Sequence, residues 1–422
     1  MAIAEDIVAR IDKDQLVEFA LELANIDSAT THEAVAAEHI YQWMRDEGFR
    51  SRKVGLLKDR FNVMGVLDGT GGGYSLLFNS HIDTHVPREH DWVHLDATAR
   101  EYHGAWREGD LLIGEGVAND KGLMAAFLLA AKAIKDSGHT LKGDLVLTGV
   151  IAESSHEPAD DIPGDIVETK DLGARFLAIH GGIADYALIA EGTGFGMVWV
   201  EPGEYWYRVT LRSKKPPLYT PYLPERTTLV ESPNMIVAAA AAIEALERWA
   251  AGYEKRNIFH SPGGTVVPKV QIGGIRGGDP NRPILAPQIT VLYLDVRAVP
   301  GQDPLRTADE IKGVLTEIGL SATVELFSFR RGYEAKNIDR LADSVRRAHV
   351  ATFGSEPLPA IADYSSLWRD INIYNEIGIP SLTYGPRSVT HAYRRTLTVD
   401  SLYQAACVYA RIAIDLCSQE KK

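Results

Sequence analysis

Residues 75–85 read SLLFNSHIDTH, an apolar run that ends in the polar sequence His81-Ile82-Asp83. Apolar runs of similar length recur along the chain, and we predict a strand at each of them: Ser75–Ser80, Asp144–Ala152, Tyr186–Ala190 and Ile379–Tyr384. Apolar residues at helical spacing predict helices at 14–26, 35–47, 121–136 and 400–417. This alternation predicts an α/β fold, a sheet with helices on both faces.

The pattern changes between about 204 and 325. Apolar residues alternate with period two at Tyr205–Leu211 and again at Ile289–Val296, with an alanine-rich helical stretch at Pro233–Tyr253 between them. We therefore predict a smaller α+β domain at 204–325, inserted into a larger domain formed by 1–203 and 326–422. A length of 422 residues is too great for one ordinary core, which agrees with two domains.

Composition narrows the class of protein. The chain has a net charge of −13, which disfavours nucleic acid and anionic membranes as partners and leaves a small-molecule substrate as the expectation. Its two cysteines, Cys407 and Cys417, exclude a disulfide framework and a thiolate metal cage. No apolar run approaches the roughly 20 residues that a membrane span needs, and the first residues lack a basic, then apolar, leader. We expect a cytoplasmic protein.

Polar residues follow the predicted strands, where open α/β sheets bind their ligands. His81 and Asp83 lie two residues apart at a strand end, so both side chains point the same way. A metal-bound imidazole commonly has its second nitrogen oriented by a carboxylate, a role that Asp83 can fill. Taken alone, the pair is more often an ordinary polar strand end.

Further acids and a histidine occupy equivalent places. Asp120 lies in the glycine-rich turn 114–122, where it could also be a plain helix cap. Glu153 and Glu191 each end an apolar strand, and His391 follows the last predicted strand after Gly-Pro-Arg. One such acid is unremarkable, whereas several at successive strand ends indicate a site.

These five segments, in this order and across nearly the whole chain, resemble the metallopeptidase and deacylase family that includes aminoacylases, acetylornithine deacetylase, succinyl-diaminopimelate desuccinylase and glutamate carboxypeptidase. The resemblance implies a metal-binding catalytic domain with an inserted lid that often dimerises, and hence a homodimer or higher homo-oligomer. It implies one metal site at His81, Asp120 and Glu191, with Glu153 as general base. It also implies that Asp120 bridges to a second metal bound by His391.

One departure from the family pattern concerns the second metal. Members usually carry two adjacent glutamates after the third strand, whereas this chain reads Glu153-Ser154. Serine is a weak, neutral donor, so the second site lacks a ligand and a charge. His156 or Glu157 could replace it, or both could lie in a solvated loop. We expect a divalent transition metal, manganese or zinc, at about one ion per chain.

Another departure concerns the lid, where the family usually offers a histidine that polarises the scissile carbonyl. The stretch Leu211–Pro233 has none, and His260 is the only histidine of the predicted insert. The stretch contains instead Lys214, Lys215, Tyr219 and Tyr222. Such departures are similar to those of an aminohydrolase acting on a nitro-substituted aminobenzoate of the 5-nitroanthranilate type, with release of ammonia.

Four residues are expected to hold a substrate carboxylate. By the resemblance, Asn281 and Arg297 match positions that bind substrate carboxylates, and Arg387 and Arg394 add guanidinium groups beside His391. The sequence thus predicts a metal-dependent hydrolase of a carbon–nitrogen bond in a small carboxylated substrate. A conventional two-metal N-acyl amino acid deacylase or carboxypeptidase stays an alternative. So does a non-catalytic relative, against which the retention of Glu153 argues.

Overall fold

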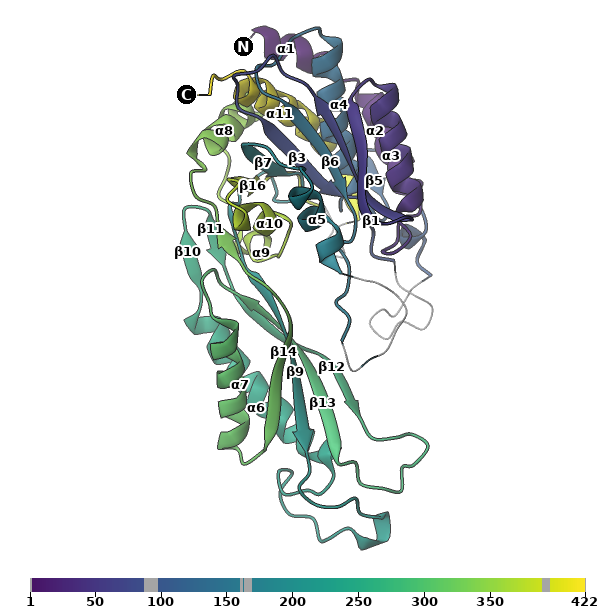
Figure 1. The fold of residues 1–422 in the computed structure, drawn as a ribbon, viewed down its shortest axis with the longest axis vertical. Helices are drawn as coiled ribbons and strands as arrows, with labels where there is room; N and C mark the ends of the chain where they lie inside the picture. Colours follow the sequence, from purple (N-terminus) through teal and green to yellow (C-terminus); the bar gives the residue numbers. More distant parts are fainter. Residues whose placement is uncertain (1, 87–97, 160–161, 163–168, 389–394, 422) are drawn as a thin grey trace. The chain divides into compact units, whose positions relative to one another are not determined.

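The computed structural model describes all residues except 1, 87–97, 160–161, 163–168, 389–394 and 422 (Figure 1). The chain forms two compact units: unit 1 comprises 1–199, 334–365 and 369–422, and unit 2 comprises 200–333 and 366–368. The predicted boundaries at 203/204 and 325/326 need correction, because they fall inside β9 (Gly203–Arg212) and β14 (Ala322–Arg330). These two strands pair with each other over almost their whole length, so neither can be divided between units.

Unit 1 is built on a mixed six-stranded sheet in the order β1-β2-β6-β3-β7-β16. Strands β6, β3, β7 and β16 run parallel; β2 pairs antiparallel with β6, and β1 pairs antiparallel with β2. Its strands are β1 (Arg50–Leu57), β2 (Arg60–Leu67), β3 (Leu76–His81), β6 (Leu145–Val150), β7 (Tyr186–Ile189) and β16 (Ser381–Thr383). A small sheet contains β4 (Trp106–Glu108), β5 (Leu111–Ile113) and β17 (Thr396–Thr398). The predicted α/β class is confirmed.

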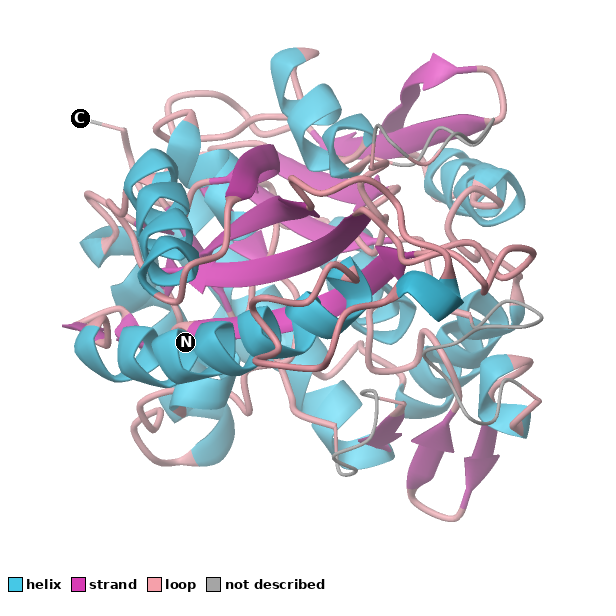
Figure 2. Ribbon diagram, turned by 90° about the horizontal axis from the view of Figure 1, so that it is seen from below, coloured by secondary structure: helices cyan, strands magenta, loops and turns pink. Residues whose placement is uncertain are grey.

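Helices cover both faces of this sheet; in Figure 2 they flank the strands. They are α1 (Ala2–Val8), α2 (Lys13–Asn25), α3 (Ala34–Asp46), α4 (Lys121–Asp136), α5 (Ala174–Ile179), α8 (Asp339–Phe353), α9 (Ala362–Ser365), α10 (Ile371–Glu376) and α11 (Val399–Cys417). On one face Phe127 of α4 stacks on Phe78 of β3, with ring centroids 5.6 Å apart. Side chains alternate between the two faces along a strand, and Asn62 of β2 points to the opposite face of the sheet. There its side-chain amide donates to the Leu172 carbonyl, just before α5.

The two cysteines lie in α11, as expected, and both are buried and free. None of the described helices combines the length and apolar composition that a membrane crossing requires.

Unit 2 has a four-stranded antiparallel sheet in the order β12-β13-β9-β14, where β12 is Lys269–Gly277 and β13 is Ile289–Ala298. The alternating residues of Tyr205–Leu211 are buried and pack with residues of α6 (Met235–Arg256) and α7 (Pro304–Glu317) in one hydrophobic core, which confirms the predicted strand and helix. Short strands are also present at β8 (Val200–Glu201), β10 (Phe259–Ser261), β11 (Gly264–Val266) and β15 (Tyr333–Glu334).

Candidate metal centre

His81 closes strand β3 and is fully buried. Its Nδ1 lies 2.8 Å from the backbone oxygen of Asp83 and 3.5 Å from the Oδ1 of the same residue. We expected the carboxylate of Asp83 to orient the His81 ring. This expectation is corrected in detail, because the backbone carbonyl of Asp83 is the nearer acceptor. When Nδ1 carries the proton that this carbonyl accepts, Nε2 keeps its lone pair for a metal. His81 Nε2 is buried and has no hydrogen-bond partner among the described residues.

The Asp83 carboxylate connects two strand ends. It accepts the backbone N–H of Glu153 at 3.0 Å and that of Ser154 at 2.8 Å. Burial opposes its ionisation, but His81 and these two N–H groups outweigh burial and lower the pKa of Asp83. The carboxylate therefore holds the loop after β6 against the end of β3.

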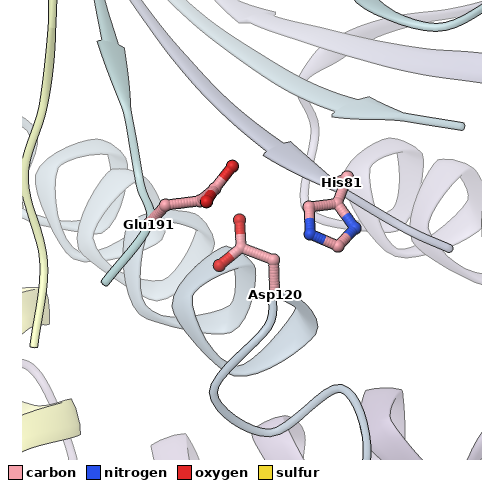
Figure 3. A group of neighbouring side chains, drawn as sticks. All are labelled: His81, Asp120 and Glu191. Carbon is pink, nitrogen blue, oxygen red and sulfur yellow. The ribbon is translucent and has the colours of Figure 1, made fainter. Parts of the chain in front are cut away.

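Asp120 and Glu191 complete a group with His81. Asp120 directly precedes α4, yet its side chain makes no capping hydrogen bond, so the plain helix-cap interpretation fails. Both carboxylate oxygens of Asp120 are buried without a partner among the described residues. One potential ligand atom from each of the three residues lies within 4.8 Å of the others, and Figure 3 shows the three side chains converging. Unpartnered buried atoms are costly unless an ion satisfies them, so the residues fit a divalent cation.

The electrostatics of the group agree with this fit. Burial, reinforced by the charge of Glu191, raises the pKa of Asp120. Burial disfavours a charged imidazole at His81, but Asp83, Glu153 and Asp120 outweigh burial and raise its pKa. Both shifts reflect an excess of negative charge in a buried place, which a divalent cation would offset.

Glu153 follows β6 on a loop where Ala152 has a φ of +64°. Its side chain is 11% exposed, and the ammonium of Lys170 lies 3.5 Å from its Oε1. Lys170 also donates to the backbone carbonyl of Glu153. The backbone of Glu153 is thus fixed, and a carboxylate held in position can accept and return a proton.

His156 and Glu157, which were proposed to replace the missing ligand of a second ion, follow Glu153 on this loop. The ring of His156 lies edge-on to that of His85, with centroids 6.0 Å apart. Glu157 Oε1 accepts hydrogen bonds from the backbone N–H and from a hydroxyl of the segment Thr169–Lys170, at 3.3 Å each. Within the described part of the chain, neither residue belongs to a group of three potential ligands. His391 lies outside the described residues, so the one-ion prediction stays a prediction.

Three of the four residues predicted to hold a carboxylate lie in the described part of the chain, two of them in unit 2 and one in unit 1. Arg297 lies in unit 2, where its Nη2 is 2.8 Å from Glu204 Oε1 and 2.9 Å from Asp295 Oδ2, so two acids already offset its charge. Asn281 is exposed on the loop between β12 and β13, and Arg387 is exposed after β16. Arg394 lies outside the described residues.

The two tyrosines expected to flank a ring, Tyr219 and Tyr222, lie in unit 2. They are 45% and 75% exposed and contact each other edge-on, with centroids 6.0 Å apart. Their contact with substrate stays a prediction, as does that of the four carboxylate-binding candidates.

Two charged residues of the site were missed by the sequence reasoning. Arg369, 1% exposed, donates from Nε to Glu191 Oε2 at 2.7 Å. The Asp370 carboxylate accepts from Asn79 at 2.9 Å, and burial, with the charge of Glu153 adding to it, raises the pKa of Asp370 to about 7. The signal available was a charged pair between the apolar residues Trp368 and Ile371, just before a helix.

Residues 77–415 match the family model of peptidase family M20/M25/M40. Among curated relatives, an N-formyl-4-amino-5-aminomethyl-2-methylpyrimidine deformylase of Bacillus subtilis (strain 168) is 30% identical over 186 residues, which are 42% of this chain and 39% of the relative. The chain therefore spans less than half the length of this relative.

Solved structures share the fold. Human carnosine dipeptidase 1 superposes with a TM-score of 0.72 at 13% identity, covering 99% of this chain and 100% of that one. A dinuclear metal-binding peptidase of family M20 from Bacillus subtilis gives a TM-score of 0.64 at 14% identity, covering 96% and 98%. At such identities the likeness shows the fold alone.

Proposed function

The chain belongs to peptidase family M20/M25/M40, and from that premise we propose that it hydrolyses a carbon–nitrogen bond of a small carboxylated substrate. As a member of a peptidase family it is an enzyme, a hydrolase. The observation that carries the proposal is the buried group of His81, Asp120 and Glu191, whose ligand atoms lie within 4.8 Å of one another. We propose that these residues bind a divalent transition metal, manganese or zinc, at one ion per chain.

The proposed mechanism assigns proton transfer to Glu153. A divalent ion, when bound, supplies Lewis-acid activation of water, lowering the pKa of a coordinated water toward about 7. Glu153 takes the proton on a carboxylate oxygen and returns it to the leaving nitrogen. Asp83 holds the backbone of Glu153 through the 3.0 Å hydrogen bond, and Lys170 holds its carbonyl. Positioning of this kind reduces the reorganisation that proton transfer requires.

The finer proposal is that the substrate is a nitro-substituted aminobenzoate that releases ammonia. Amide hydrolysis builds charge on a carbonyl oxygen, and losing a donor aimed at that oxygen costs roughly 2.7 to 4 kcal/mol. The only histidine of unit 2, His260, lies in β10 with its Nδ1 3.0 Å from Thr265 Oγ1. An electron-poor ring can spread the incoming charge into its own nitro group, so this substrate tolerates the absence of a lid histidine.

A second candidate is hydrolysis of an N-acyl or N-formyl amide. It is favoured by the 30% identity with a pyrimidine deformylase over 186 residues. Both candidates break a carbon–nitrogen bond and use the same metal group and the same Glu153. They differ in their products. The first candidate reaction releases ammonia, and the second releases an amine and a carboxylic acid.

The test is a substrate panel with protein loaded with Mn²⁺ or Zn²⁺. The panel contains 5-nitroanthranilate, N-formyl and N-acetyl amines, N-succinyl-diaminopimelate and dipeptides, and the readouts are ammonia and carboxylic acid. D120N, which removes one ligand charge, is the inactive control. Ammonia from the nitroanthranilate alone supports the first candidate, and acid release from an amide supports the second. Turnover of no panel member by metal-loaded protein, or equal turnover by D120N, would contradict the proposed function.

The assembly and location of the enzyme stay predictions. We expect a homodimer or higher homo-oligomer in the cytoplasm, which size-exclusion chromatography with light scattering and cell fractionation would test.

A further inference from the structure

Arg369 is a buried charge that the proposed mechanism leaves unused. It is among the largest fully buried side chains of the chain and is 1% exposed. All three of its side-chain nitrogens donate: Nε to Glu191 Oε2 at 2.7 Å, Nη1 to the Tyr364 carbonyl at 2.8 Å and Nη2 to the Gly192 carbonyl at 2.9 Å. Burying a guanidinium is costly unless it is paired and hydrogen-bonded, so the contacts fix this cation in one position.

That position is against one of the three residues of the candidate metal centre. The two side chains of the ion pair, Arg369 and Glu191, are 1% and 3% exposed, so water screens their interaction little. A metal ligand imidazole must be neutral, so in the ion-bound group the charge of the ligands comes from the carboxylates of Asp120 and Glu191, and Arg369 offsets one of these two negative charges. A divalent ion placed there would face a net charge of about −1 instead of −2.

We infer that Arg369 sets the charge of the metal centre: it weakens ion binding and makes the bound ion a stronger Lewis acid. When the ligands contribute less negative charge, more of the ion's positive charge acts on water. The affinity for the ion falls, and its ability to activate water rises. The same positive charge disfavours a second cation beside Asp120, in line with Ser154 in place of an acid. Arg369 is then a positioning residue that acts through Glu191, and this inference rests on the proposed metal site.

The alternative is that Arg369 only holds Glu191 in place. The two roles predict opposite changes in ion affinity when the charge is removed. Loss of a mere support would loosen a ligand and weaken binding. Loss of a buried like charge beside the ion would instead strengthen binding, by roughly 10- to 100-fold for charges a few ångströms apart in a poorly screened site.

The experiment measures Mn²⁺ affinity at pH 8 by competition with a fluorescent chelator, so that no activity is needed. R369M and R369Q remove the charge, and R369K keeps it. R60M is the matched control, since Arg60 is also a buried arginine, 6% exposed, paired with Glu33 at 2.7 Å. We expect at least tenfold tighter binding in both uncharged variants, near wild-type affinity in R369K, and unchanged affinity with a lower Tm in R60M.

R369M could fail to fold without an ion. R369Q then provides the test, because the glutamine amide can still donate to Glu191. Affinity equal to or weaker than wild type in the uncharged variant that folds, with R60M unchanged, would overturn the inference. A wild-type chain that binds neither Mn²⁺ nor Zn²⁺ would refute the metal site itself, which distinguishes failure of the proposed function from failure of this inference.

Discussion

Replacing Glu153 by glutamine separates proton transfer from metal binding. Glutamine has nearly the shape of glutamate, and its backbone N–H can still donate to Asp83, as it does at 3.0 Å in the wild-type chain. The interaction of Lys170 with the backbone carbonyl is also retained. What is lost is a carboxylate oxygen that can take and return a proton. Folding and the group of His81, Asp120 and Glu191 should therefore survive E153Q.

The size of the effect follows from the role. A positioned general acid–base contributes roughly 10²- to 10⁴-fold to a rate, and each tenfold is about 1.4 kcal/mol of barrier, so E153Q should raise the barrier by roughly 3 to 5 kcal/mol. The side chain of Glu153 is 11% exposed, so bulk water has little access to replace it as the proton acceptor.

The assay is kcat at saturating substrate with ion content measured on the same sample. The matched control is E157Q, four residues along the same loop, where the acid accepts hydrogen bonds from the segment Thr169–Lys170. We expect a loss of at least about 100-fold in E153Q at wild-type ion content and a change below about threefold in E157Q. Wild-type turnover in E153Q would refute the assignment of Glu153 as base, and loss of the ion would show that it is a ligand instead.

Three further predictions concern other parts of the site. Elemental analysis after mild dialysis should find about one ion per chain; two retained ions, with His156 or Glu157 coordinating in a crystal, would contradict this. K170M should lower kcat with ion content unchanged, because Lys170 holds the carbonyl of Glu153, and equal kcat in K170M would exclude that role. Burial raises the pKa of Glu115 from its ordinary value near 4.5 to about 7, so the folded chain holds this proton more tightly. Its stabilising contribution is present below about pH 4.5 and is lost as the pH rises through 7; the Tm of the ion-free wild type, relative to that of E115Q, should fall between about pH 5 and pH 8, and a constant difference would contradict this.

The parallel strands β3, β6, β7 and β16 and the helices α2, α3, α4 and α11 could be predicted from the sequence because their signals are local. Helix α4 begins and ends where the apolar spacing placed it, and β3 and β6 lie within two residues of their predicted bounds. The hairpin of β1 and β2 was not predicted. Charged residues on the outer strand, whose burial pattern is mostly exposed, hide the alternation that identifies a strand.

The grouping of His81, Asp120 and Glu191 could be predicted for a similar reason. His81 ends β3 and Glu191 follows β7, two neighbouring parallel strands whose ends meet at one edge of the sheet, and Asp120 directly precedes helix α4. Position at strand ends indicated a site, and the resemblance to the metallopeptidase family implied which three residues form it. The sequence did not indicate which oxygen atom accepts from His81 Nδ1, because the local backbone conformation decides this.

By itself the sequence determined the α/β class and the alternating strand and alanine-rich helix of the segment 204–325, because periodicity and residue type are properties of short segments; its resemblance to a known family indicated which residues could bind a metal. Only the tertiary structure decided that Arg369 pairs with Glu191, 178 residues away, and that Asp83 holds the loop of Glu153. Periodicity indicates which face of an element is buried, but not which distant side chain meets it there. The charge around a buried ligand therefore depends on long-range packing.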